Sequence, residues 1–244
     1  MAVSSDAGNE KEFINKPLVG GTAILTLGLW ASKVTHSSQD DSGFRSFSIA
    51  TIQGRFKKCL SLVSAYISVQ KGSDVGVDSL YAQQVTIHEK RYLPTKNIPA
   101  FCPRTNAIKR LNSTIHNLQK KDHAVILMLG ANQSFDECFN SSALKPFSIK
   151  LLRIQRGMTD PFKSIMSKRP NSSTLLPNRD IDYVLSFGVT ISAISTLSPS
   201  IPAHSDHLGI IFDIDVESFF SSSYSDTSHA TVGLHRYSAG HMYK

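Results

Sequence analysis

The chain has 244 residues, of which 41% are hydrophobic and 18% are charged, and its formal net charge is +7. These values exclude a wholly disordered or fibrous chain and indicate a globular protein of one large domain or two small ones. A basic balance fits a polyanionic partner such as nucleic acid, and it fits a merely basic surface equally well.

The compartment follows from the cysteines and from what the apolar segments lack. Cys59, Cys102 and Cys138 lie far apart and form no CxxC pair, which favours a reducing compartment. No apolar stretch approaches the ~18 residues that a membrane span needs. The first fifteen residues are polar and acidic and lack the apolar core of a signal peptide. We therefore expect a protein of the nucleus or cytoplasm with no membrane partner.

The first half of the chain predicts strands followed by two helices. Residues 1–17 are polar and are expected to be disordered. Alternating and apolar runs predict strands at 22–27, 46–52 and 60–69, with a polar turn at 37–43 and a loop at 71–78. Helices are predicted at 79–89 and after Pro103, where Ile108, Leu111, Ile115 and Leu118 recur at helical spacing. The apolar run 124–129 predicts a strand buried on both faces.

The second half predicts a helix over 141–156, a Ser-, Pro- and Asn-rich loop over 161–179, and strands at 181–185 and 208–214. From residue 218 onward the composition predicts a flexible tail. A metal site from His229, His235 and His241 is the weaker interpretation of that tail, since their spacing does not share a helical face. Strands that alternate with helices predict an α/β or α+β class, with one domain over 18–217.

Polar residues stand at or near the ends of four predicted strands: Tyr66, Asn132, Asp182 and the pair Asp206-His207. Loops at the ends of sheet strands gather scattered residues into one site. Carboxylates, an amide and an imidazole suit metal-assisted hydrolysis, because oxygen ligands hold a hard cation such as Mg²⁺. Taken singly, Tyr66 is equally a core tyrosine and Asn132 a turn residue. Asp182 lies inside an apolar strand and needs a partner, for which His207 is a candidate.

Six short segments carry a resemblance to a known family. In chain order they are Gly20–Leu25, Val63–Tyr66, Val125–Asn132, Gly157–Asp160, Ile181–Leu185 and Ser205–His207. Together they resemble the endonuclease/exonuclease/phosphatase superfamily, which includes deoxyribonuclease I and the apurinic endonucleases. More narrowly, they resemble the endonuclease region of non-LTR retrotransposons. The resemblance covers about residues 20–215 and implies a DNase I-like four-layer sandwich of two packed β-sheets flanked by helices.

The resemblance also implies a reaction, in which water attacks a DNA phosphodiester with the aid of Mg²⁺ or Mn²⁺ and no small-molecule cofactor. Asn132 would orient the water or the phosphate, and Tyr66 would hydrogen-bond a phosphate oxygen. His207 would stabilise charge on the phosphoryl group, held in its protonated orientation by Asp182. Asp206 would help to place the metal. These roles are those of electrostatic catalysis by positioned charge.

One departure from the family pattern predicts impaired activity. The family's D-x-N motif stands here as Gly130-Ala131-Asn132, so a glycine replaces the aspartate that would accept the proton of the attacking water. General-base catalysis contributes typically about 10²–10⁴-fold to a rate. We therefore expect a weak or inactive enzyme.

A second departure concerns the start of the chain. In the family, an early Asn and a metal-binding Glu precede the Gly-Gly strand by a long stretch, whereas nineteen residues precede Gly20 here. Glu10 and Glu12 lie in a polar segment with no strand around them, and neither is assigned as the metal ligand. Asp180 also stands where the family usually has Arg. The expectation is a truncated copy that lacks the N-terminal strands of the fold.

Three functions stay open at this stage. The first is an impaired, metal-dependent DNA endonuclease. The second is a non-catalytic nucleic-acid-binding remnant, for which the net charge and the pairs Lys57-Lys58, Lys109-Arg110, Lys120-Lys121 and Lys168-Arg169 speak. Salt-dependent binding without cleavage would select it. The third is a phosphatase acting on a phosphoinositide or nucleotide, which the retrotransposon resemblance disfavours.

Overall fold

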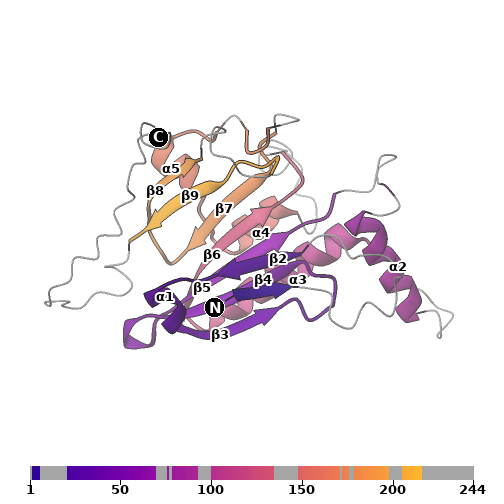
Figure 1. Cartoon of the computed structure of the whole chain (residues 1–244), viewed down its shortest axis with the longest axis horizontal. Helices are drawn as coiled ribbons and strands as arrows, with labels where there is room; N and C mark the ends of the chain where they lie inside the picture. Colours follow the sequence, from indigo (N-terminus) through magenta and orange to yellow (C-terminus); the bar gives the residue numbers. More distant parts are fainter. Residues whose placement is uncertain are drawn as a thin grey trace, which may run out of the picture.

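The computed structural model describes residues 2–5, 21–69, 76, 79–92, 100–134, 148–170, 172–175, 179–197 and 205–215 (Figure 1). A five-stranded sheet forms its centre, in the order β3 (Val34–Gln39), β4 (Phe47–Gln53), β5 (Cys59–Tyr66), β6 (His123–Gly130) and β7 (Asp182–Phe187). β5 and β6 run parallel, and the other neighbours are antiparallel. The ends of β5 and β6 therefore meet the start of β7 at one edge of the sheet.

Two small sheets lie on one face of this central sheet. One pairs β1 (Ala2–Ser5) with β2 (Thr22–Leu25), and the other pairs β8 (Ile191–Thr196) with β9 (Ile210–Ile214). The hydroxyls of Thr22 and Ser48 lie 2.9 Å apart between β2 and β4. On the β8–β9 side an apolar cluster joins the two layers, with Leu60, Ile126, Val184, Ile191, Ile194 and Phe162 among its buried members.

Helices cover the opposite face. α2 (Leu80–Tyr92) and α3 (Pro103–Lys120) connect the parallel strands β5 and β6, and α4 (Ile149–Gln155) follows β6. α3 lays its apolar stripe on the sheet, where the buried residues include Ile108, Leu111, Ile115, Val63, Val125 and Leu127. Three short elements complete the described part: α1 (Leu29–Ser32), the 3₁₀ turn η2 (Arg55–Lys57) and α5 (Pro161–Met166). None of the described helices is long and apolar enough to span a membrane.

The α/β class with a central sheet, a second sheet layer and helices is confirmed. The strand over 124–129 is buried on both faces, since its residues alternate between the helix-side and the sheet-side clusters. The predicted helices at 79–89 and after Pro103 are also present as α2 and α3. The tail over 218–244, with its three histidines, lies outside the described residues.

Four local predictions are corrected. Residues 2–5 are not disordered, because they pair with β2. Residues 37–39 belong to β3, whose polar side chains suit a strand at the edge of the sheet. The expected loop over 161–179 begins with α5, which Asp160 caps by accepting from the N–H of Phe162 while Pro161 takes the first helical position. The sequence did not predict β8 at all. Within the helix expected over 141–156, α4 begins after the N-cap Ser148, and residues 141–147 lie outside the described residues.

A polar row crosses the end of the sheet where β5 and β6 begin. The hydroxyls of Thr51 and Ser61 lie 3.0 Å apart, and the Ser61 hydroxyl lies 2.8 Å from Nδ1 of His123. Thr51 and Ser61 are buried. Since an uncharged imidazole nitrogen accepts a hydrogen bond from a hydroxyl, this row fits a neutral His123.

His123 is expected to make stability depend on pH. Burial, followed by the charges of Lys121 and His36, lowers the pKa of His123 below its ordinary value, with Asp122 opposing them. The unfolded chain therefore binds a proton more readily, so the contribution of His123 is complete above about pH 6.5 and is lost as the pH falls below that value. The urea midpoint should fall further between about pH 7.5 and 5.5 in the wild type than in His123→Gln. Equal falls in the two proteins would contradict this assignment.

Candidate functional site

Three strand ends meet at Gly130. This glycine is in register with Tyr66 of β5 on one side and with Asp182 of β7 on the other. A Cβ atom built on Gly130 would lie 3.3 Å from Cδ2 of Tyr66 and 3.5 Å from Oδ1 of Asp182. The side chains of Tyr66 and Asp182 therefore flank the same small space, on the face of the sheet that carries β8 and β9.

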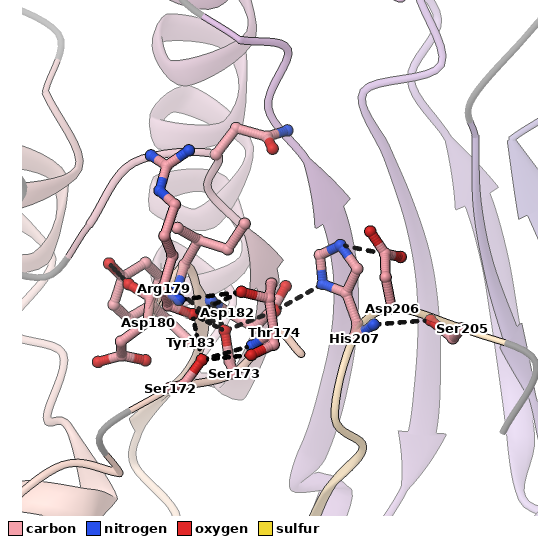
Figure 2. Close-up of polar contacts among 12 residues, drawn as sticks. Ser172, Ser173, Thr174, Arg179, Asp180, Asp182, Tyr183, Ser205, Asp206 and His207 are labelled. Atoms are coloured by element: carbon pink, nitrogen blue, oxygen red, sulfur yellow. Dashed lines mark hydrogen bonds and ion pairs between the residues drawn. The ribbon is translucent and has the colours of Figure 1, made fainter. Parts of the chain in front are cut away.

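Asp182 and His207, 25 residues apart in the sequence, are bonded directly to each other. Nδ1 of His207 lies 2.7 Å from Oδ2 of Asp182 (Figure 2). Because an ionised carboxylate only accepts hydrogen bonds, Nδ1 carries the proton in this contact. The other ring nitrogen, Nε2, is left free of Asp182, and the side chain of His207 is 38% exposed. The imidazole is therefore fixed at one end and accessible at the other.

Ser173 fixes the carboxylate that holds His207. Its fully buried hydroxyl oxygen accepts hydrogen bonds from the backbone N–H groups of Ile181 and Asp182, at 2.9 and 3.0 Å. The same hydroxyl donates to Oδ2 of Asp182 at 2.7 Å. Since both the backbone and the carboxylate of Asp182 are held by one buried group, the orientation of the carboxylate is set before any ligand arrives.

A short backbone pairing brings His207 to this point. Thr174 and His207 form an isolated antiparallel bridge. On either side of it, the N–H of Leu175 donates to the carbonyl of Asp206 at 2.7 Å, and the N–H of Leu208 donates to the carbonyl of Ser173 at 2.8 Å. The segment 172–175 therefore positions both members of the Asp182–His207 pair, one through a side chain and the other through the backbone.

Arg169 lies buried behind the start of β7. Its guanidinium donates to Asp160 at 3.1 Å, to Asp180 at 2.6 and 2.9 Å, and to the carbonyl of Asp182 at 2.9 Å. It also lies 4.6 Å from the centre of the Tyr183 ring. Burial opposes the charge, but the hydrogen bonds and charges of Asp180 and Asp160 outweigh it and raise the pKa of Arg169 above its ordinary value. Arg169 is thus a permanent cation that ties three backbone segments together.

Asn132 follows β6 in the left-handed conformation, with φ of 49°. Its side-chain amide donates to the carbonyl of Ile67 at 2.9 Å. The buried Arg104 of α3 makes a parallel link, since it donates to the carbonyls of Ala131 and Ser68 at 2.8 and 3.1 Å. In this structure Asn132 is therefore a turn residue that joins the loops after β5 and β6. A role in orienting water or phosphate stays a prediction.

The described residues do not by themselves form a magnesium site. Asp206, the predicted metal ligand, has a 73% exposed side chain, and its Oδ1 lies 4.0 Å from Nε2 of His207. Oδ2 of Asp182 already receives two hydrogen bonds, and Gly130 supplies no oxygen ligand from its side chain. Within the described ranges, no group of three or more His, Cys, Asp or Glu residues is placed to hold a metal ion. The use of Mg²⁺ or Mn²⁺ stays a prediction, and no chemical step below depends on it.

Sequence reasoning missed Ser173 and Arg169. Ser173 lies in a Ser-rich stretch that is typical of a loop, and nothing in its neighbours marks it as buried. Asp180 offered a usable signal, because it stands where the resembled family has Arg. The structure supplies the missing cation from Arg169, eleven positions upstream. The substitution is therefore accompanied by a local exchange of charge.

No known family model matches this chain, and no curated protein matches it either. Solved structures do show a likeness. The human nocturnin catalytic domain with bound sulfate has a TM-score of 0.45 and 14% identity, over 77% of this chain and 60% of that chain. The chain thus spans less than two thirds of the nocturnin domain.

Two further structures have a similar likeness. A variant of the Neisseria 3′ phosphatase NExo, bound to a product DNA hairpin, has a TM-score of 0.48 and 11% identity over 75% of this chain and 71% of that chain. The catalytic domain of Xenopus laevis APE2 has a TM-score of 0.45 and 12% identity over 70% of this chain and 55% of that chain. Identity this low says nothing of individual residues, so each role proposed below depends on contacts within this chain.

Proposed function

We propose that this chain binds DNA and slowly hydrolyses its phosphodiester bonds at the edge formed by Tyr66, Asp182 and His207. The observation that carries the proposal is the 2.7 Å contact between His207 and Asp182, together with the buried Ser173 that fixes Asp182. An accessible imidazole held by an oriented carboxylate is suited to stabilising charge on a phosphoryl group. The order of the six motif segments supports an origin in the endonuclease region of a non-LTR retrotransposon.

The proposed chemistry uses the fixed end and the accessible end of His207 differently. Asp182 holds the ring through Nδ1 and stabilises its protonated form, so that Nε2–H donates to a phosphate oxygen. The hydroxyl of Tyr66 donates to a second phosphate oxygen. Water adds to phosphorus and releases its proton to solvent, while the bond to the departing ribose oxygen breaks and that oxygen gains a proton. Positioned donors of this kind stabilise the charge that develops in the transition state.

The same geometry explains why the reaction should be slow. Gly130 occupies the position between Tyr66 and Asp182 where the resembled family carries an aspartate. Without that carboxylate, the attacking water must lose its proton to solvent. The missing general base removes a contribution of about 10²–10⁴-fold.

The test is nicking of supercoiled DNA in the presence of Mg²⁺. The wild type is expected to nick slowly, and His207→Ala is expected to lose about 10²-fold or more, the usual effect of removing a transition-state donor. His116→Ala provides a matched control, because His116 lies on α3 and takes no part in the site. Nicking by His207→Ala at the wild-type rate would falsify the proposal, and rapid nicking by the wild type would refute the impairment.

A second candidate function has its own support. The glycine at position 130 and the net charge of +7 favour a domain that binds nucleic acid without cleaving it. This function would show salt-dependent binding of DNA, since phosphate contacts weaken as salt rises, with no cleavage at any protein concentration. That pair of results would replace the hydrolase proposal.

A further inference from the structure

The end of the sheet opposite to the Asp182–His207 pair carries an unusual turn. Residues Gly54–Lys58 connect β4 to β5, and Cys59, which follows them, is in register with His123 at the start of β6. The eight residues of β5 separate this turn from Tyr66, a distance of about 23 Å at the usual rise per residue. The turn is therefore remote from the candidate active site.

Two consecutive residues of this turn are strained. Phe56 has φ of 49° and Lys57 has φ of 64°, both in the left-handed region. Backbone hydrogen bonds from Lys58 to Arg55 at 2.8 Å and from Gly54 to Lys58 at 2.7 Å close the turn. Two left-handed residues in succession are typical of a type I′ turn, which strongly prefers Asn-Gly. Phe and Lys are poor residues for this geometry.

Phe56 is also exposed, at 86% of its surface. An exposed phenylalanine in a left-handed conformation disfavours folding in two separate ways, because the ring stays in water and the backbone is strained. Strain of this kind persists where the surroundings enforce it, and it clusters at functional positions. The turn presents the ring outward instead of burying it.

Cations surround this ring. Arg55, Lys57 and Lys58 lie in the turn itself, and the backbone of Lys33 accepts a hydrogen bond from Gln53 at 2.9 Å. Lys121, at the end of α3, lies two residues before the strand partner of Cys59, with Asp122 as the acidic residue between them. Of these cations, Lys33, Lys57, Lys58 and Lys121 are exposed. The basic charge therefore continues across the ends of β3 to β6.

We propose that this end of the molecule, the basic tip, is a second nucleic-acid-binding surface that takes single-stranded DNA or RNA. It comprises Lys33, Arg55, Phe56, Lys57, Lys58 and Lys121. The lysines and the arginine contact phosphates while a base stacks on Phe56, which is the combination that binds single strands without sequence preference. A lipid surface is instead recognised by an extended apolar face, whereas the turn presents one ring between cations. The basic tip does not depend on hydrolysis at His207.

The first experiment uses Phe56→Gly and a short fluorescent single-stranded oligonucleotide, with EDTA present. The dissociation constant is expected to rise about tenfold through loss of stacking. Because glycine accepts a positive φ freely, the melting temperature is expected to rise by about 2–4 °C. A purely structural Phe56 would move both quantities the other way or leave binding unchanged, and either result overturns the proposal.

The second experiment tests the charges. Lys57→Gln/Lys58→Gln should reduce the slope of log affinity against log salt by about 2, one for each lost phosphate contact. Lys150→Gln/Lys163→Gln removes the same charge from α4 and α5 and should leave the slope unchanged. Equal losses in the two double variants would mean that diffuse charge alone binds the oligonucleotide, and would refute a defined surface.

Two further outcomes separate this proposal from its alternatives. His207→Ala should retain full oligonucleotide binding at the basic tip, whether or not the chain proves to be a hydrolase. Vesicles containing phosphatidylserine serve as the other probe. If Phe56→Gly abolishes vesicle binding and leaves oligonucleotide binding intact, the basic tip is a membrane contact and the nucleic-acid proposal fails.

Discussion

Gly130→Asp is expected to raise the rate of DNA nicking by about 10²–10⁴-fold, the usual contribution of a general base. The new carboxylate would stand between Tyr66 and Asp182, in the same register and on the same face as the Asp182–His207 pair. From there it can accept the proton of a water that attacks a phosphate held by His207. The measurement is the initial rate of conversion of supercoiled to nicked DNA in the presence of Mg²⁺.

The backbone and the packing both bear on this substitution. Gly130 is not among the residues with positive φ, so a side chain is compatible with its backbone conformation. The added Cβ would approach Cδ2 of Tyr66 to 3.3 Å, so the tyrosine ring must shift by a few tenths of an ångström. A second carboxylate beside Asp182 also adds like-charge repulsion. We therefore expect the variant to gain activity and to lose some thermal stability.

Two control variants separate these effects. Gly130→Asn has nearly the same shape as the aspartate but no carboxylate, so it should gain no activity. Gly130→Ala measures the packing cost of a Cβ alone. A gain by the asparagine variant equal to that of the aspartate variant would contradict general-base catalysis. A folded Gly130→Asp that nicks no faster than the wild type would show that position 130 does not limit the reaction.

The parts of the site that follow from local chemistry were predictable from the sequence. A carboxylate inside an apolar strand must find a partner, and Asp182 finds His207 as that reasoning indicated. Six consecutive apolar residues predicted a strand with both faces covered, and β6 is buried in this way. These predictions needed the identity of a few residues and no knowledge of which segments meet in space.

The parts that depend on distant contacts were not predictable. Ser173 acts on Asp182 only because residues 172–175 fold back along residues 206–208, and no sequence pattern records that pairing. β8 carries few large side chains in its pattern and is a strand because β9 pairs with it. Phe56 would be expected in the core from its type alone, whereas the turn that carries it leaves it exposed.

Arg169→Met is expected to lower the free energy of unfolding by about 3–5 kcal/mol, the usual effect of removing one partner from a buried ion-pair network. The side chain of Arg169 is 6% exposed, and those of Asp160 and Asp180 are 2% and 11% exposed. Methionine fills much of the same volume, so the loss would come from the two carboxylates left without their cation. Urea unfolding followed by circular dichroism measures the change.

Arg179→Met is the matched control, because it makes the same substitution at an exposed arginine ten positions along the chain. Arg179 contributes backbone contacts to Ser173 and Thr174, which the substitution leaves in place. Its effect should stay within about 0.5 kcal/mol, as for most surface changes. Equal losses at the two arginines would therefore show that burial of Arg169 has no special consequence.

A triple variant identifies the cause of the loss. Adding Asp160→Asn and Asp180→Asn to Arg169→Met removes the unpaired charges, and more than half of the lost stability should return if uncompensated charge is responsible. The asparagine at 160 also keeps a side-chain oxygen that can cap α5. If Arg169→Met alone costs less than about 1 kcal/mol, well below the range for a buried pair, the cation does not hold the start of β7. The position of Asp182 would then depend on Ser173 and on the apolar contacts of Tyr183.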